Sequence, residues 1–548
     1  MVVGISGAGS EHPMHDDEIH PDVLNRRWAI LGVLCLSLVI VIIGNTSLNV
    51  AIPVLAKDLN ASTSQLQWMV DAYSLVFAGL LFAAGTVGDR YGRKGVLQFG
   101  LGLFLLSAAV ATAADSTGLV IASRAVMGVA AAFVMPATLS ILTNVFPSHE
   151  RPKAIAVWAG ISGAGAALGP IISGWLLNHY WWGSVFLVNV PVILVAMVLG
   201  AVFVPKSKNP EEHPVDLLGV LLSIVGLSAL VYAIIEAPNW GWTSPSAIGV
   251  FAVAVAALVG FALWEMRAEF PMLDLRLFRD RRFSVASAGM ALIFFAMFGT
   301  FFMVAQYFQM VLGYSPLDSG LLMLPWAAVM MVLSPMVPGL VARFGAHRVV
   351  PVGLAVTALG LWVFSWFDVD TSLAMIYVSV IPLAVGMTLS MTPLTTLIMS
   401  SVPLGKAGVG SAMNDTTREL GGALGVAILG SVMSSVYVSN LAPSIEDLPA
   451  PVREIAGDGL AGALGVAAEL GEAGKAVSAA AMHAFVDGLS VAAISGAVVV
   501  LVAAVASWFL LPAGHDVPPG AQAEASAEEG AAGELIDEGV LEAGPVIH

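Results

Sequence analysis

Long apolar stretches separated by short polar segments follow one another along almost the whole chain. Each stretch is long enough for a helix of about 20 residues that crosses a bilayer. Because lipid satisfies no backbone polar groups, isolated spanning segments of this kind are helices. The pattern therefore predicts an all-α polytopic membrane protein with 14 transmembrane helices, at 28–50, 66–86, 96–114, 118–143, 154–178, 184–204, 217–237, 246–265, 283–311, 317–341, 349–367, 372–402, 408–438 and 483–511.

The basic residues between these stretches predict the orientation. If the N-terminus is inside, the inside segments hold most of the Lys and Arg residues, and the outside segments hold only Lys57, Arg453 and Lys475. Cytoplasmic loops of membrane proteins carry such an excess. We therefore expect both termini to be cytoplasmic.

Composition changes this picture little. Only 11% of the residues are charged and 58% are hydrophobic, whereas a soluble domain carries about 25% charged residues. The net charge of −16 arises largely at the two ends, which we interpret as a cytoplasmic acidic tail (1–27) and a disordered acidic cytoplasmic tail (512–548). An acidic docking tail is the alternative. The single cysteine, Cys35, excludes an intrachain disulfide and a cysteine-based metal site.

The chain shows internal symmetry. An Arg-aromatic-Gly sequence occurs in the loop 85–94 and again in the loop 338–348. Both loops join two apolar spans and both are predicted inside. The sequence thus predicts two parallel six-helix bundles, 28–204 and 283–511, separated by two inserted helices in 217–265. Parallel repeats of this kind are a transporter architecture, with the substrate site near the midplane between the halves.

One outside segment, 439–482, is unusually long. It contains prolines at first and becomes rich in Ala, Gly and Glu. We expect an extracytoplasmic loop with one or two short amphipathic helices.

Three charges interrupt the span that runs from 407 to 438: Asp415, Arg418 and Glu419. Ionisable residues in a membrane are expensive and indicate a functional site by default. At 1.5 Å per residue, Asp415 is about 12 Å deep and Glu419 about 18 Å. Arg418 can reach Asp415 at i+3, so the two form a predicted pair, which is a structural pair in the alternative interpretation. Glu419 has no partner nearby in the sequence, and we interpret it as the proton carrier.

Several short motifs recur in one group of known transporters. They are the loop 85–94, Arg124 with Gly128, the segment 165–174 with Ser173 where Gly is usual, and the segments 48–53 and 186–191. On these motifs the chain resembles the fourteen-span drug:proton antiporters of the major facilitator superfamily, the QacA/EmrB type, over residues 28–511. The resemblance implies the major facilitator fold.

Two features resemble the QacA/SmvA/LfrA-like branch of that family. The segment 68–75 contains an embedded Asp71, and Asp415 and Glu419 match a pair of carboxylates in the branch. Gly44 departs from the family, which often has Asp at that position. The resemblance implies that proton coupling rests on Glu419, Asp415, Arg418 and Asp71.

The resemblance also implies gating residues in three of these motifs: the loop 85–94, the segment 165–174 and Arg124. The loop would act as a charged latch, for which simple positive-inside anchoring is the alternative. The glycines of span 5 let helices approach closely and its proline favours a kink, either as a sealing contact between halves or as ordinary packing. A buried Arg124 would tune a carboxylate partner, whereas a snorkelling arginine is the alternative. The predicted gating residues are Asp89, Arg90, Gly92, Arg93, Lys94, Arg124, Gly165, Gly169 and Pro170.

Substrate contacts are expected from acidic and aromatic side chains. Asp71 would contact a lipophilic cation, with Trp68 and Tyr73 offering π faces; an acid at a helix N-terminus is the alternative interpretation of Asp71. Span 9 is a further candidate wall, with Gln306 and Tyr307 next to Phe298, Phe301 and Phe302.

The resemblance implies proton-coupled efflux of amphipathic, cationic compounds such as quaternary ammonium compounds, dyes and antibiotics. The chain contains no Walker A, HExxH or nucleotide fingerprint, so we expect no cofactor, no metal site and no enzyme activity. The expected partners are small amphipathic substrates, protons and lipid, without nucleic acid, for a monomer in the bacterial cytoplasmic (inner) membrane. A dedicated exporter of one endogenous metabolite or lipid, and a non-transporting receptor, are the alternatives.

Overall fold

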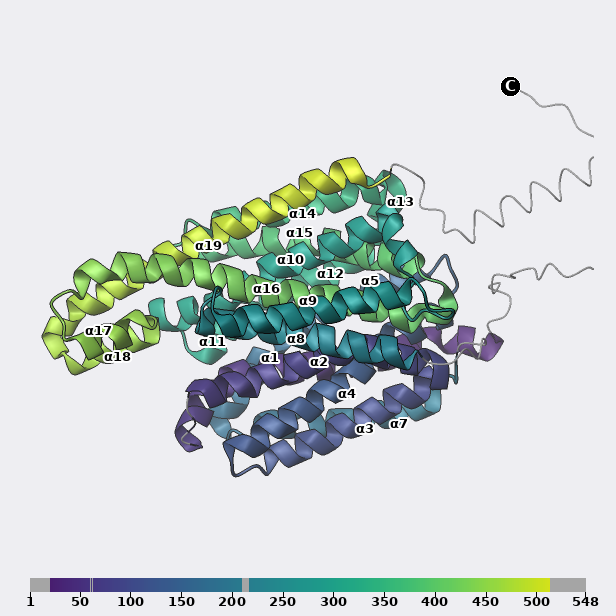
Figure 1. Cartoon of the computed structure of the whole chain (residues 1–548), viewed down its shortest axis with the longest axis horizontal. Helices are drawn as coiled ribbons and strands as arrows, with labels where there is room; N and C mark the ends of the chain where they lie inside the picture. Colours follow the sequence, from purple (N-terminus) through teal and green to yellow (C-terminus); the bar gives the residue numbers. More distant parts are fainter. Residues whose placement is uncertain (1–19, 60, 62, 209–215, 513–548) are drawn as a thin grey trace, which may run out of the picture.

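The computed structural model describes residues 20–59, 61, 63–208 and 216–512, and this part of the chain is helical, with no strand (Figure 1). Fourteen of its helical segments are long and apolar enough to cross a membrane. Each overlaps one predicted span. The predicted all-α polytopic architecture is therefore confirmed.

The helices of the first half and the inserted pair follow the apolar runs closely. Their bounds are Pro21–Asp58 (α1), Thr63–Tyr91 (α2), Arg93–Thr112 (α3), Thr117–Val145 (α4), Arg151–His179 (α5), Ser184–Leu187 (α6), Asn189–Phe203 (α7), Leu217–Trp240 (α8) and Pro245–Glu265 (α9).

The second half begins after a short 3-10 turn, Leu275–Arg279 (η2). Its helices are Arg281–Gln306 (α10), the π-helical continuation Tyr307–Val311 (η3), Pro316–Leu321 (α11), Leu324–Leu333 (α12), Ser334–Met336 (η4), Val337–Phe344 (α13), Ala346–Phe364 (α14), Leu373–Ser400 (α15), Leu404–Lys406 (η5), Ala407–Leu441 (α16), Ala442–Ser444 (η6), Ala450–Gly457 (α17), Leu460–Glu469 (α18), Gly471–Ala473 (η7) and Gly474–Leu510 (α19).

Capping residues fix where the inserted helices begin. The Asp216 side chain accepts a hydrogen bond from the backbone N–H of Gly219 at 2.9 Å, at the start of α8. The Ser244 hydroxyl accepts one from the N–H of Ala247 at 3.1 Å, and Pro245 follows it at the first position of α9. Such caps each stabilise a helix by about 1 kcal/mol, and proline suits the first helical turn.

The helices form two groups, one in each half of the chain, and a few helices make the contacts between the groups. In the first half α2 and α3 pack on α4, and α1 packs on α5; in the second half α14 packs on α15 and α19, and α10 packs on α16. The halves meet where α5 lies against α11 and α12, and where α16 lies against α2 and α4. The helix α16 is therefore central to the contact between halves.

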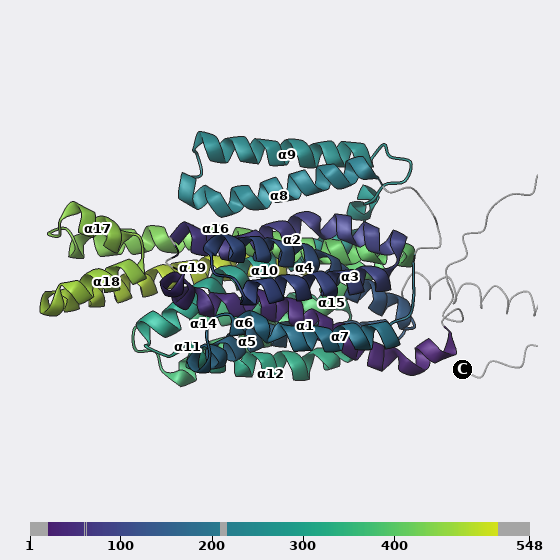
Figure 2. The ribbon, with the colours of Figure 1, turned by 90° about the horizontal axis from the view of Figure 1, so that it is seen from below.

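The inserted helices form a pair at one side of the bundle (Figure 2). The helix α8 packs on both α2 and α16, and α9 packs on α8. A Cβ added to Gly79 of α2 would lie 2.1 Å from the Ser228 hydroxyl of α8, so these two helices are in close contact. Only 17% of the residues in the apolar stretch of α9 are buried, as expected for a helix that faces lipid.

The segment 439–482 is more helical than predicted. The helix α16 continues to Leu441 and α19 already starts at Gly474, so the last span begins earlier than the expected 483. Between them lie two short helices, α17 and α18, in agreement with the prediction. The Tyr437 hydroxyl donates to the carbonyl of Ala456 at 3.0 Å, which ties α17 to α16. This helical extension projects beyond the other spans (Figures 1 and 2).

The start of α1 and the end of α19 lie at one end of the bundle, and the α17–α18 extension lies at the other (Figure 1). These two ends are called the terminal side and the extension side below.

Candidate functional site

The charged residues of α16 lie within the membrane-spanning bundle. Asp415 is 1% exposed. Its Oδ1 lies 3.5 Å from Nη1 of Arg418 and accepts a hydrogen bond from the side-chain amide of Asn414 at 3.2 Å. Its Oδ2 has no hydrogen-bond partner among the described residues. The pair that the i, i+3 spacing predicts is therefore present, with one carboxylate oxygen unused.

Arg418 also reaches across to the first half. Its Nη2 donates to the hydroxyl of Ser162 on α5 at 3.2 Å. The guanidinium carbon lies 4.6 Å from the ring centre of Phe294 on α10 and 6.0 Å from that of Trp158 on α5. A cation over an aromatic face is stabilised in this way. Arg418 thus connects the carboxylate of α16 to α5, through contacts that the sequence did not reveal.

Glu419 follows Arg418 and is half-buried. It makes no hydrogen bond or ion pair with another described residue, whereas Asp415 is held by Arg418 and Asn414. Arg418 therefore contacts Asp415 directly and acts on Glu419 only through its charge. The role of Glu419 as the proton carrier stays a prediction.

A second charged cluster, which we call the clasp, lies at the terminal side. Asp89 of α2 accepts hydrogen bonds from the backbone N–H of Gly408 at 3.1 and 2.8 Å. Arg93 forms an ion pair with Asp89 at 2.9 Å and donates to the carbonyls of Leu404 and Gly405 at 3.0 and 3.3 Å. Asp89 and Arg93 are 5% and 1% exposed. The clasp therefore joins α2 and α3 to the start of α16.

The helices α2 and α16 approach each other closely at the clasp because two glycines have no side chains there. A Cβ added to Gly85 would lie 2.5 Å from the carbonyl oxygen of Gly408, and one added to Gly408 would lie 2.8 Å from Oδ2 of Asp89. The first-turn N–H groups of a helix favour a carboxylate, so the start of α16 is a suitable receptor for Asp89.

The other basic residues of this loop stay in the first half. Lys94 donates to the carbonyl of Ala201 on α7 at 2.7 Å, and the Arg90 guanidinium lies 5.6 Å from the ring centre of Tyr91. Gly92 has φ of +113° and precedes α3, a conformation that favours glycine. Among the described residues of the predicted latch, Asp89 and Arg93 bridge the halves.

Arg124 is fully buried, so it is not a snorkelling residue. It donates to the carbonyls of Met69 and Gly44 at 2.9 and 2.8 Å and to the side-chain carbonyl of Asn45 at 3.4 Å. Its guanidinium lies 4.4 Å from the ring centre of Tyr73. The expected carboxylate partner is not found among the described residues; main-chain oxygens and an aromatic face take its place.

Gly44 also shows why this chain has no acid in span 1. A Cβ at this position would lie 2.6 Å from Cζ of Phe104, so the ring fills the space that an acidic side chain would need.

Two of the predicted substrate contacts are used internally. Tyr73 is 1% exposed. Its ring contacts the Arg124 guanidinium, and its hydroxyl donates to the carbonyl of Val41 at 3.4 Å. Tyr307 is fully buried, and its hydroxyl donates to the carbonyl of Asp368 at 2.5 Å. These positions do not support substrate-binding roles for Tyr73 and Tyr307. The neighbouring Gln306 is half-buried at the end of α10.

Tyr307→Phe is expected to leave drug export unchanged and to lower thermal stability slightly. The substitution removes one hydrogen bond, worth about 1 kcal/mol, and keeps the ring packing on Phe367. Thermal unfolding of the purified protein and export by whole cells measure the two effects. Export that falls severalfold without a change in protein amount would restore the substrate-binding role.

Asp71 is half-buried and hydrogen-bonded to the Gln67 side chain. The inserted helix α8 places further side chains beside it. The Trp68 ring centre lies 5.9 Å from that of Tyr232 on α8. Glu236 of α8 is a second acidic residue close to Asp71. Neither α8 residue was identified from the sequence, because it belongs to a span outside the two repeats.

The glycines of α5 divide between two faces. A Cβ at Gly169 would lie 1.9 Å from Oγ1 of Thr46, and one at Gly165 would lie 3.5 Å from Ile42, both on α1. Gly165 and Gly169 therefore pack on α1 within the first half, as the alternative of ordinary packing predicts, and Pro170 lies inside the same helix.

On α5, the contact between the halves is made by Gly174, one of the glycines of the predicted motif, and by Gly160 and Gly163, which lie outside that motif. A Cβ at Gly160 would lie 2.9 Å from Ser334, and one at Gly163 would lie 2.2 Å from Met330. Nearer the extension side, a Cβ at Gly174 would lie 3.2 Å from Leu317. The second half thus approaches α5 along most of its length.

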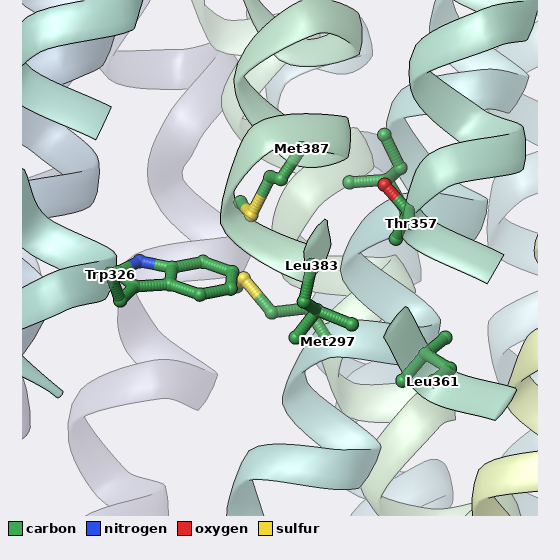
Figure 3. Close-up of a pocket in the computed structure, with 7 residues that line it drawn as sticks. Met297, Trp326, Thr357, Leu361, Leu383 and Met387 are labelled. Carbon is green, nitrogen blue, oxygen red and sulfur yellow. The ribbon is translucent and has the colours of Figure 1, made fainter. Parts of the chain in front are cut away.

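A small, mostly apolar cavity lies inside the second half, between α10, α12, α14 and α15 (Figure 3). Its lining residues are Ile293, Met297, Trp326, Thr357, Leu361, Leu383 and Met387. A second cavity shares Leu361 and Leu383 and also reaches Phe301 and the hydroxyl of Thr300, which has no partner among the described residues. Of the span-9 aromatic residues considered, Phe301 lies at a cavity, whereas Phe298 and Phe302 are exposed on the protein surface.

Comparison with known proteins places this architecture among transporters. Residues 34–426 match the Major Facilitator Superfamily. The multidrug efflux pump LfrA of Mycolicibacterium smegmatis is 37% identical over 485 residues, which cover 87% of this chain and 95% of the relative. The methyl viologen resistance protein SmvA of Salmonella typhimurium is 34% identical, covering 89% and 98%.

Two further comparisons support the same architecture. The tetracenomycin C resistance and export protein of Streptomyces glaucescens is 33% identical, covering 88% of this chain and 91% of the relative. The crystal structure of a bacterial homologue of the human lysosomal transporter Spinster aligns with a TM-score of 0.56 and 17% identity, covering 88% and 96%. At that identity the likeness concerns the fold alone.

Proposed function

Because the chain belongs to the Major Facilitator Superfamily, we propose that it is a proton-coupled multidrug efflux antiporter. It exports amphipathic, cationic compounds by alternating access, and it is driven by the proton gradient without a cofactor. The curated relatives support export of drugs, since LfrA is named a multidrug efflux pump and SmvA a methyl viologen resistance protein. Methyl viologen is itself a dication.

The observation that carries the proposal is the group of charges on α16. Asp415 and Glu419 lie within a membrane span, and Arg418 connects that span to α5 of the other half. A carboxylate at this depth can bind either a proton or a cation, because both neutralise its charge. A cationic drug favours the ionised form, and proton and drug then compete for the same charge.

The orientation of the protein in the membrane decides which end of the bundle takes up drug. We assign the terminal side, with both termini, to the cytoplasm of a bacterium, because Lys and Arg residues are concentrated in the segments predicted inside. The clasp of Asp89 and Arg93 then closes the cytoplasmic end, and opening it admits drug. The protein is a monomer in the cytoplasmic membrane, and its partners are small amphipathic substrates, protons and lipid.

The coupling step uses Arg418. With Asp415 ionised, Arg418 is held by the carboxylate and by the hydroxyl of Ser162. Protonation of Asp415 removes the charge that holds Arg418, and it therefore weakens the contact between α16 and α5. Glu419, without such a partner, exchanges the transported proton with drug.

A dedicated exporter of one compound is the second candidate. One relative is named for the resistance to and export of tetracenomycin C, which favours this candidate. A panel of chemically unrelated cations separates the two: a multidrug pump confers resistance to several, and a dedicated exporter confers resistance to one class.

The test of the proposal is ethidium transport by inverted membrane vesicles. Acidifying the vesicle interior should drive uptake of ethidium, and an uncoupler should collapse it to the level of vesicles without the protein. Addition of drug should also release protons from preacidified vesicles. Uptake that survives the uncoupler, or that requires ATP, would overturn proton-coupled export.

A further inference from the structure

Two carboxylates meet at the terminal side of the inserted pair, away from the site on α16. Asp216 precedes α8 and Glu265 ends α9. A Cβ added to Gly219 would lie 2.5 Å from Oδ2 of Asp216 and 2.7 Å from Oε1 of Glu265. Both oxygens therefore flank one small space, which is left open because residue 219 is a glycine.

Asp216 has the donors that stabilise a charged carboxylate. Its Oδ1 accepts the N–H of Gly219 at 2.9 Å, and the indole N–H of Trp264 lies 2.8 Å from each of its two oxygens. It also stands at the N-terminus of α8, where the helix dipole favours negative charge. These donors hold the Asp216 carboxylate in place beside Glu265.

Glu265 is in the opposite situation. It is 4% exposed, and its Oε2 accepts the N–H of Leu273 at 3.2 Å, with the N–H of Met272 also facing the carboxylate. Its Oε1 has no hydrogen-bond partner among the described residues. A buried, unpartnered anionic oxygen that faces a second carboxylate is unfavourable. A proton on Oε1 removes the repulsion and supplies a donor towards Asp216.

We infer that Glu265 and Asp216 together bind one proton while the clasp is closed, and that opening of the clasp releases this proton to the cytoplasm. The inference rests on the proposed proton-coupled export and adds to it a second proton site. The step breaks no bond other than the O–H bond of Glu265, whose proton passes to water.

The segment 266–282, which we call the strap, connects this pair to the clasp. The strap residue Leu273 donates to Glu265, and the carbonyl of Pro271 accepts from Nζ of Lys406 at 2.8 Å. Lys406 directly follows Leu404 and Gly405, whose carbonyls accept from Arg93 of the clasp. A movement of α16 away from Arg93 would therefore also displace the strap, through the hydrogen bond between Lys406 and Pro271.

The charged groups that act on Glu265 are Asp216 of α8 and Lys406 of η5. Lys406 favours the ionised form and Asp216 favours the protonated form. With the clasp closed, Glu265 is buried beside the Asp216 carboxylate, so we expect the closed state to bind the proton more tightly than the open state. By linkage, acid then favours closure and higher pH favours opening.

The experiment measures the distance between spin labels on Lys153→Cys and Phe344→Cys, which belong to α5 and α13 of opposite halves. Both positions are exposed, and the native Cys35 is buried. In nanodiscs of the full chain without drug, the fraction of molecules with the long distance should rise as the pH rises. Glu265→Gln, a permanent mimic of the protonated form, should abolish this rise and keep the short distance.

Two further variants sharpen the test. Asp216→Asn removes the carboxylate that favours the proton, so the rise should move to lower pH. Glu269→Gln, at an exposed carboxyl of the same strap, should titrate like the wild type. Because no drug is present, the measurement stays valid even if export fails. A wild-type pH response in Glu265→Gln, or a response to Na⁺ at constant pH, would refute the site.

Discussion

Asp89→Asn is expected to abolish export while folded protein remains in the membrane. Asn keeps the size of the side chain but removes the charge that Arg93 requires, and Arg93 is only 1% exposed. Loss of one partner from a buried ion pair costs about 3–5 kcal/mol. Asn also turns an amide donor towards either Gly408 N–H or Arg93, which both donate. The closed clasp should therefore become rare, and the transport cycle should stop.

The measurement is ethidium efflux, normalised to the amount of protein in the membrane. We expect a loss of at least about tenfold, since roughly 1.4 kcal/mol already changes an equilibrium tenfold. Asp115→Asn is the matched control, because Asp115 is an exposed carboxyl in the loop between α3 and α4. Full efflux by Asp89→Asn would show that the clasp is ordinary anchoring.

The number and type of spans could be predicted from the sequence because a bilayer demands long, continuous apolar helices. The ends on the extension side could not be predicted as well. There α16 runs to Leu441 and α19 starts at Gly474, where small, mixed residues give no sharp change of hydropathy. Helix contacts such as that between Tyr437 and Ala456 stabilise these turns, and they depend on tertiary structure.

Within the candidate site, local pairs could be predicted and contacts between distant helices could not. Asp415 and Arg418 are three residues apart, so helix geometry alone brings them together. The contact of Arg418 with Ser162 depends on how α5 and α16 are placed. For the same reason the sequence showed that the glycines of α5 form small faces, but not which face meets the second half.

Glu419→Gln is expected to abolish pH-gradient-driven efflux without loss of protein from the membrane. Gln has nearly the same shape and cannot exchange a proton. Glu419 makes no direct ion pair or hydrogen bond with another described residue, but it lies near enough to Arg418 to interact with its charge. The substitution therefore breaks no direct contact, and we expect the protein to stay folded. A structural role therefore predicts normal efflux, and a proton-carrying role predicts its loss.

Binding measurements separate proton exchange from assembly. In wild-type protein, ethidium binding should strengthen as the pH rises, because ionised Glu419 attracts the cation and the proton competes with it. In Glu419→Gln the pH dependence should be lost or strongly reduced, while thermal stability stays close to wild type. Glu454→Gln, at an exposed carboxyl of α17, should retain both efflux and pH-dependent binding. Wild-type efflux by Glu419→Gln would show that Glu419 does not carry the transported proton.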